Sequence, residues 1–209
     1  MLQVLLLACT PKPEPKIQPD PLCACSGIAL PDTSIVEASA LLELLKGVQV
    51  ALYPEENGLN LSIEAVDDLQ FFQAWIELST LSNPPESRSY IIRYDPMVLS
   101  DPPEPVAVAA ILGHELGHVL DYLGKDTEEM VSFAAWYGSE DPASSDALAD
   151  YERGTDEKAM ERGCADGLSR MREWIYAHVD PETEAIKRRE YYTPEEIADW
   201  VSVHGACKP

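Results

Sequence analysis

The stretch Gly113-His114-Glu115-Leu116-Gly117-His118 lies in the middle of an apolar run at residues 106–123. Histidines four residues apart lie on one face of a helix, about one turn from each other. The imidazoles of His114 and His118 can therefore bind one zinc ion, while Glu115 points toward the remaining face of that ion. The apolar flanks predict a buried helix, in which these polar groups would be costly without a partner. We therefore predict a zinc site on this helix.

A zinc ion needs a third protein ligand, and a catalytic zinc also keeps an open position for water. The metzincin pattern, with a third histidine six residues after His118, is absent because that position is Gly124. Glu152 and Asp156 are four residues apart, so a helix places both carboxylates on one face. This pair resembles the third-ligand helix of the gluzincin (thermolysin-like) metallopeptidases. The resemblance implies that Glu152 is the third zinc ligand and that Asp156 orients the ring of His114.

Other acidic residues compete for the role of third ligand. Asp156 ends the tripeptide Gly154-Thr155-Asp156, which resembles the aspzincin signature Gly-Thr-x-Asp with its spacing changed by one residue. In that family the aspartate itself is the ligand. Glu157 and Glu161 are alternative ligands on the same helix, and an acidic pair is also typical of a charged surface. These alternatives stay open at the level of sequence.

The resemblance implies a zincin fold and the hydrolysis of peptide bonds in a protein or peptide substrate. Zinc lowers the pKa of its bound water, and Glu115 would act as the general base that takes the water's proton. Two other functions fit the same residues. One is a zinc-binding envelope protein without peptidase activity, and the other is a zinc amidase that acts on peptidoglycan.

Peptide hydrolysis also needs a donor that stabilises the oxyanion, often a tyrosine or histidine in this family. We favour Tyr191 or Tyr192, because they follow a basic cluster that is unusual in so acidic a chain. Arg188 or Arg189 in that cluster could meet a substrate carboxylate or the acids of the site. The further candidates are His178, His204, Tyr137 and Tyr151.

Hydrophobic periodicity predicts an α+β fold: a small antiparallel or mixed sheet followed by a mainly helical half that carries the active-site helix. A first helix is expected at residues 35–45, with Gly47 as its stop. Strands are expected at 48–52, 59–66, 75–81 and 89–94, and helices at 105–123, 127–136, 145–178 and 193–203. In zincins the strand before the active-site helix forms the upper edge of the cleft, and residues 89–94 are placed for this role.

The N-terminal segment Leu6-Leu7-Ala8-Cys9 resembles a bacterial lipoprotein signal, although no Lys or Arg precedes its apolar residues. We expect residues 1–8 to be a signal segment, 9–26 a proline-rich tether and 27–209 the zincin-like domain. The protein would then lie at the bacterial cell envelope, lipid-anchored or secreted, and would contact a membrane only through a lipid on Cys9.

Four further cysteines suggest disulfides in an exported chain. Because a Cys-x-Cys pair is strained when it bridges to itself, we expect Cys23 and Cys25 to pair with Cys164 and Cys207 in an order that stays open. Free thiols and a cysteine-based zinc site are the alternatives.

Composition excludes some partners. The chain has 209 residues, enough for one domain with a full core, and a net charge of −22 from 15 basic and 37 acidic residues. So negative a protein repels phosphate backbones, and we therefore expect no nucleic-acid partner. We expect a soluble monomer.

Overall fold

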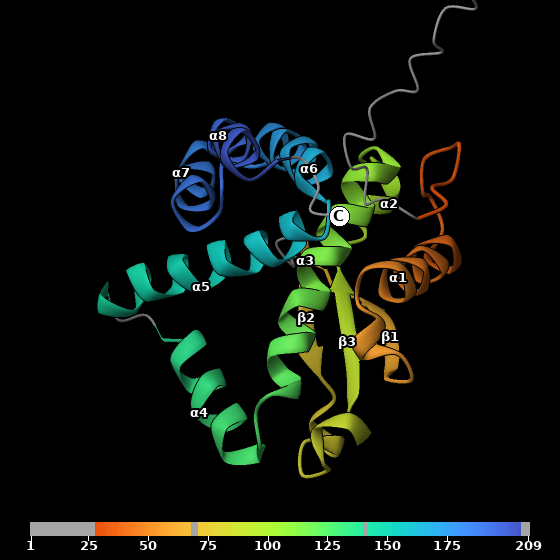
Figure 1. The fold of residues 1–209 in the computed structure, drawn as a ribbon, viewed down its shortest axis with the longest axis vertical. Helices are drawn as coiled ribbons and strands as arrows, with labels where there is room; N and C mark the ends of the chain where they lie inside the picture. Colours follow the sequence, from red (N-terminus) through yellow and green to blue (C-terminus); the bar gives the residue numbers. More distant parts are fainter. Residues whose placement is uncertain (1–27, 68–70, 140–141, 206–209) are drawn as a thin grey trace, which may run out of the picture.

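The computed structural model describes residues 28–67, 71–139 and 142–205, and it has a mixed α+β fold (Figure 1). Helix α1 and three short strands come first, and the remainder of the described chain is helical. The elements are α1 (Ala38–Leu52), β1 (Asn60–Ala65), β2 (Phe72–Ile76), β3 (Ser89–Tyr94), α2 (Met97–Ser100), α3 (Pro105–Leu123), α4 (Thr127–Tyr137), α5 (Pro142–Glu161), α6 (Ala165–His178), α7 (Pro181–Glu190) and α8 (Pro194–His204).

The sheet of the described residues is mixed, with strand order β1-β3-β2. Strand β1 is parallel to β3, whereas β2 is antiparallel to it. The expected placement of residues 89–94 at the edge of a cleft is therefore wrong, because both sides of β3 are already paired. Strand β2 is the edge strand that lies next to α3.

Helix α1 is longer than predicted, and the strand expected at residues 48–52 does not form. The buried side chains of Leu41, Leu45, Val48 and Leu52 recur every three or four residues, so they cover one continuous helical face. Gly47 lies within this helix and does not end it. The apolar segment after Gly47 satisfies a helical face as well as a strand, and packing against α3 decides for the helix.

Strand β2 also ends earlier than predicted. A strand was expected at residues 75–81, but after Ile76 the chain enters a 3-10 turn at Leu78–Thr80. The backbone N–H of Thr80 donates to the carbonyl of Glu77, and Leu78 is 70% exposed. Leu78 contributes to the alternating apolar pattern that is typical of a strand, but its side chain is exposed and residues 78–81 pair with no strand. The pattern alone therefore predicted too long a strand.

The long helix predicted at residues 145–178 is divided into α5 and α6. Gly163 has a φ of 89°, a left-handed conformation that glycine adopts without strain. The N–H of Cys164 bonds to the carbonyl of Ala159, and that of Gly163 bonds to Met160, which is the hydrogen-bond pattern of a Schellman cap. Helix α7 was not predicted. Its N-terminus is capped by Asp180, whose side chain accepts bonds from the first-turn N–H groups.

Helix α3 is the centre of the fold, in agreement with the predicted helix at 105–123. Every residue from 107 to 119 is buried, because α1, α5, α6 and strand β2 surround the helix. By length and composition alone α3 could cross a membrane, but 78% of its apolar window is buried within the protein. Its apolar character is therefore accounted for by the core.

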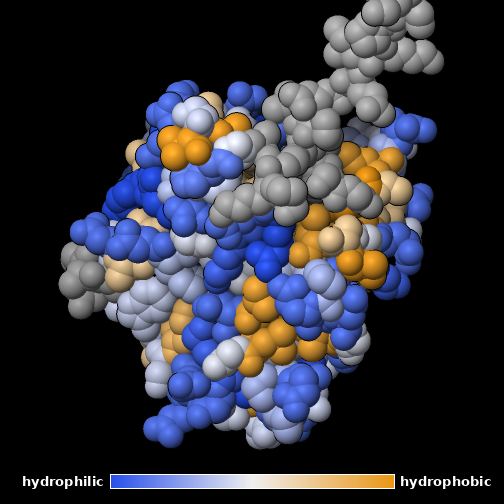
Figure 2. All heavy atoms as spheres, viewed as in Figure 1, coloured by the Kyte–Doolittle hydropathy of each residue, from blue (hydrophilic) through white to orange (hydrophobic). Residues whose placement is uncertain are grey.

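Figure 2 shows mostly hydrophilic residues over α5 and α7, and hydrophobic residues gathered over α1. Val36 and Val50 are among the exposed large hydrophobic residues of that region. Cys164 is buried. The other cysteines and the N-terminal segments expected at 1–8 and 9–26 lie outside the described residues, so the predicted pairing and the lipid anchor stay predictions.

Candidate metal centre

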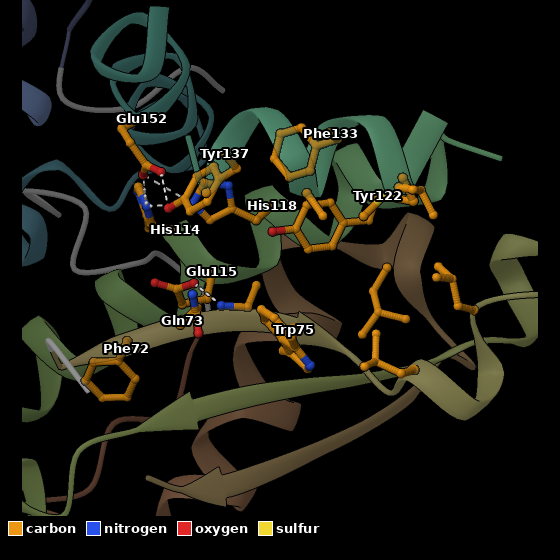
Figure 3. Close-up of a pocket in the computed structure, with 18 of the residues that line it drawn as sticks. Phe72, Gln73, Trp75, His114, Glu115, His118, Tyr122, Phe133, Tyr137 and Glu152 are labelled. Carbon is orange, nitrogen blue, oxygen red and sulfur yellow. Dashed lines mark hydrogen bonds and ion pairs between the residues drawn. The ribbon is translucent and has the colours of Figure 1, made fainter. Parts of the chain in front are cut away.

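Three buried side chains from α3 and α5 converge at one point (Figure 3). The Nε2 atoms of His114 and His118 lie 3.1 Å apart. Glu152 Oε2 lies 3.2 Å from the Nε2 of His114 and 3.3 Å from that of His118. These atoms form a nearly equilateral triangle of potential ligands. The group could hold a metal ion.

One carboxylate oxygen of Glu152 has no hydrogen-bond donor among the described residues, which points to a cation as its partner. Its Oε1 accepts a hydrogen bond of 2.8 Å from the Tyr137 hydroxyl. Its Oε2 is buried and forms no hydrogen bond with any described residue, although it faces two imidazoles. A buried carboxylate oxygen is costly unless a donor or a cation satisfies it.

Asp156 fixes the orientation of His114. Its Oδ1 lies 2.8 Å from the Nδ1 of His114, and because a carboxylate only accepts, the proton belongs to Nδ1. Arg172 donates to the same oxygen at 2.7 Å, and the backbone N–H of Tyr192 donates to Oδ2 at 3.0 Å. Asp156 therefore binds the far side of the ring and leaves Nε2 turned toward Glu152.

The competing ligands lie elsewhere. Asp156 is on the Nδ1 side of His114, so it does not join the three converging atoms. Glu157 is exposed and accepts a bond of 2.6 Å from the Tyr192 hydroxyl. Glu161 is exposed as well and is not part of the described cluster. Glu152 is the acid that packing selects.

The anions around His114 favour a positive charge at this point. Burial lowers the pKa of His114, but the neighbouring carboxylates of Asp156 and Glu152 raise it more, to about 9. Burial raises the pKa of Glu152, while His118 and His114 together bring it well below its ordinary value. A proton or a metal cation is thus strongly favoured between these groups.

Glu115 lies beside the cluster and faces the edge strand. Its Oε2 accepts a hydrogen bond of 2.6 Å from the backbone N–H of Ala74 on β2. Burial is the largest influence on its pKa, which is raised. Figure 3 shows Glu115 directed toward β2, below the imidazoles of His114 and His118. Its carboxylate is therefore held close to the ligand atoms without being one of them.

A cavity of about 610 Å³ opens over these residues and extends between β2 and α4. His114, Glu115, His118 and Glu152 line one end. Apolar and aromatic side chains line the other end, and they include Trp75, Tyr122 and Phe133. The volume and the mixture of an apolar wall with a few polar groups are typical of a small-molecule or peptide site.

The two predicted oxyanion donors are placed differently. Tyr191 lines the cavity, and its ring centroid lies 5.8 Å from that of His114. The guanidinium of Arg172 lies 4.3 Å from the centroid of the Tyr191 ring and supports it from behind the site. Tyr192 instead directs its hydroxyl to Glu157, and only its backbone N–H reaches Asp156.

Of the other candidates, only the two tyrosines lie near the cluster. Tyr137 donates to Glu152, and the Tyr151 hydroxyl lies 3.0 Å from Nδ1 of His118. His178 stacks on Trp174 and His204 stacks on Trp200, and neither histidine lines the cavity. The two arginines of the basic cluster, Arg188 and Arg189, pair with Glu184 and Glu190 respectively.

The sequence analysis missed two groups of this site, Arg172 and the N–H of Ala74. Arg172 lies on the apolar face of α6 that also carries Leu168 and Met171. A charged residue on such a face indicates a buried ion pair, so the sequence did contain a sign of it. Ala74 gave no such signal, because only the tertiary structure brings β2 to the cavity. Lys187 belongs to the basic cluster that precedes Tyr191, and of that cluster it is the member that lines the cavity.

Comparison of the chain with protein-family models, curated protein sequences and solved structures found no match.

Proposed function

We propose that this protein is a zinc-dependent peptidase, in which Glu115 is the general base. The observation that carries the proposal is the triangle formed by His114, His118 and Glu152. Ligands that lie about 2.0 to 2.1 Å from a tetrahedral zinc ion are about 3.3 Å from each other. The three observed separations of 3.1, 3.2 and 3.3 Å fit one face of such a tetrahedron. The fourth position would be left for water.

The donor set also supports zinc. Two imidazoles and one carboxylate are a ligand combination of catalytic zinc sites, whereas calcium and magnesium prefer oxygen ligands alone. Each donor has a supporting partner: Asp156 for His114, Tyr151 for His118 and Tyr137 for Glu152. Such partners orient the ligands and raise the affinity for a metal.

When bound, the metal would supply an acidified water and polarise a carbonyl group. Glu115 would accept the proton of this water through the oxygen that Ala74 does not occupy, and would then give the proton to the leaving amine. The C–O bond to the water oxygen would form first and give an oxyanion, and the C–N bond would then break as the amine takes the proton, so one water is consumed for each bond cleaved. Tyr191 would donate a hydrogen bond from its hydroxyl to the oxyanion from the cavity wall.

Strand β2 supports a peptide as the substrate. It is an edge strand, and Gln73, Ala74 and Trp75 line the cavity. An extended peptide can add to such an edge by main-chain hydrogen bonds. We place this role on β2 and not on residues 89–94. The zincin family, the envelope location and the lipid on Cys9 belong to the same proposal and rest on sequence motifs alone.

The test compares wild type with Glu115→Gln and with Glu157→Gln, an exposed carboxylate on α5 that serves as the matched control. We expect one zinc per chain in all three proteins by elemental analysis. Cleavage of casein and of a peptide library should fall roughly 100-fold or more in Glu115→Gln and stay unchanged in Glu157→Gln. Bound zinc with full activity in Glu115→Gln would contradict the assigned base, and a wild-type protein that binds no zinc would contradict the metal site.

A further inference from the structure

Lys187 differs from the other basic residues around the site. It lies on α7 and is the single Lys or Arg among the described residues that line the cavity of Glu115 and Glu152. Its ammonium lies 5.2 Å from the ring centroid of Tyr191. Within the described part of the chain this ammonium forms no hydrogen bond and no ion pair. The protein thus places one cation without a hydrogen-bonding or ionic partner at the cavity of the proposed reaction centre.

The acids that face Lys187 are each bound to another group. Glu190 pairs with Arg189 at 3.3 Å, and Glu152 faces the imidazoles of His114 and His118. The carboxylate of Glu115 accepts from Ala74. The remaining charge that faces Lys187 is that of Arg172, which is neutralised by Asp156 at 2.7 Å.

An ammonium without a close partner is informative in this chain. Acidic residues outnumber basic ones by 37 to 15, so a nearby counter-ion is the common situation for a lysine here. Burial lowers the pKa of Lys187, because the neighbouring charges replace only part of the hydration that its ammonium loses. A bound anion would remove this deficit, since a charge-assisted hydrogen bond is strongest where water is excluded.

The charge balance of the site points to the same ligand. In the ionised form that a general base requires, Glu115 adds one negative charge to that of Glu152, and a divalent metal would balance the two. Lys187 then leaves one positive charge in excess. A carboxylate is the anion that a peptide carries, either at its C-terminus or on an Asp or Glu side chain.

We propose that Lys187 forms a carboxylate-binding subsite, so that the preferred substrates are peptides with a carboxylate close to the cleaved bond. This inference rests on the proposed peptidase function. The carboxylate would lie on the α7 side of the cavity, and the apolar wall around Phe133 would take an apolar side chain at the other end. Lys187 is a specificity-determining residue in this assignment and takes no part in the proton transfers of Glu115.

The cleavage test uses pairs of peptides that differ only in charge. One pair has a free or an amidated C-terminus, and the other has an internal Glu or Gln in an amidated peptide. We expect wild type to cleave the carboxylate member of one pair with a kcat/KM at least tenfold higher, and the responding pair identifies the source of the carboxylate. Lys187→Met should bring this ratio close to one, and Lys187→Arg should retain most of it. Lys46→Met is the matched control, because Lys46 forms an exposed ion pair with Glu43 on α1, and it should keep the wild-type ratio.

A binding measurement separates this inference from the peptidase function. Calorimetry on zinc-loaded Glu115→Gln records the affinity for the same peptides without turnover. We expect at least tenfold tighter binding of the carboxylate member, and loss of this preference in the double variant Glu115→Gln/Lys187→Met. Equal binding of both members, no binding of either up to millimolar concentration, or a preference that survives the double substitution would overturn the subsite. Loss of cleavage with the binding preference intact would overturn only the peptidase.

Discussion

Asp156 shows at the scale of one residue how a buried carboxylate prepares a metal ligand. It accepts bonds from His114, Arg172 and the backbone of Tyr192, and it is fully buried. The short bond to Nδ1 fixes both the tautomer and the direction of the imidazole. A neutral group at this position would hold the ring less firmly and would make its nitrogen a weaker ligand.

We therefore expect Asp156→Asn to lower zinc affinity roughly 10- to 100-fold. The measurement is a competition titration with a chelator of known affinity, combined with urea unfolding to register any loss of stability. Asp150→Asn provides the control, because Asp150 lies on the same helix and is exposed. Equal zinc affinities for wild type and a folded Asp156→Asn protein would argue against the orienting role of this aspartate.

Glu56 is a buried carboxyl group that does not line the cavity. Both of its oxygens are buried and have no hydrogen-bond partner among the described residues. Burial and the charge of Glu55 raise its pKa while Arg162 lowers it, and the net result is a rise from 4.5 to about 8. The folded chain thus holds this proton more tightly than the unfolded chain. The resulting stabilisation is complete below pH 4.5 and is lost as the pH rises through about 8.

We expect Glu56→Gln to remove this dependence on pH. Relative to the variant, the free energy of unfolding of wild type should fall by roughly 1.4 kcal/mol per pH unit between about pH 5 and pH 8. Urea unfolding at pH 5, 7 and 9 measures the difference. Glu64→Gln, at an exposed ion pair with Arg93, should follow the wild-type curve, because Glu64 does not act on Glu56. Parallel curves for wild type and Glu56→Gln would show that Glu56 titrates as it does in the unfolded chain.

At the scale of elements, the close approach of α3 and α6 depends on a glycine. A Cβ atom added to Gly167 would overlap the backbone carbonyl of Val106 and would lie 2.6 Å from the Cβ of Ala110. Backbone atoms cannot move aside as the end of a side chain can. In contrast, a Cβ atom on Gly154 in α5 would meet nothing within 4 Å.

Gly167→Ala should therefore destabilise the protein by roughly 1 to 3 kcal/mol, since it overpacks the contact between two helices. Gly154→Ala should instead stabilise it by up to about 1 kcal/mol, because alanine is the better helix former and no clash opposes it. Chemical unfolding of both variants decides the matter. A stabilising Gly167→Ala would mean that α3 and α6 are farther apart than the structure has them.

Elements with their own local signals were predictable. Helix α8 begins at the capping box of Thr193 and Glu196, and α3 begins with Pro105 and ends before Gly124, as the sequence indicates. Elements whose pattern fits two structures were not. Residues 48–52 are apolar enough for a strand or a helix, and their packing against α3 decided between them.

At the scale of the whole molecule, the candidate metal centre joins two helices that are separated in sequence. Helix α3 provides His114 and His118, and α5 provides Glu152. A ligand that binds the folded chain alone stabilises it by about 2.7 kcal/mol at a free concentration 100 times its Kd. Metal bound here would thus oppose the separation of α3 from α5.

We expect a chelator to lower the Tm of zinc-loaded wild type by several degrees. Glu152→Gln weakens the site, so the same chelator should change the Tm of that variant much less. Differential scanning calorimetry with and without chelator gives both values. A chelator effect of the same size in the two proteins would place the stabilising metal at other residues.

The sequence by itself determined which site residues lie on the same face of one helix. The spacing of His114 and His118 is enough to place two imidazoles on one helical face, because helix geometry is fixed over one turn. The same holds for Glu152 and Asp156 on α5. Only the tertiary structure decided that Glu152 faces the imidazoles while Asp156 binds Nδ1, since this depends on how α5 crosses α3.

Tertiary structure also decided which neighbours face the cavity. Tyr191 and Lys187 line it, whereas Tyr192 turns to Glu157. Tyr191 and Tyr192 are the same residue type in the same sequence context, so the sequence cannot tell them apart. Their side chains point in different directions because of how α7 and α8 pack. The order of the strands, with β2 and not β3 at the edge, depends on pairings between segments far apart in the chain. Local propensity carries no information on such pairings, so they emerge only when the chain folds.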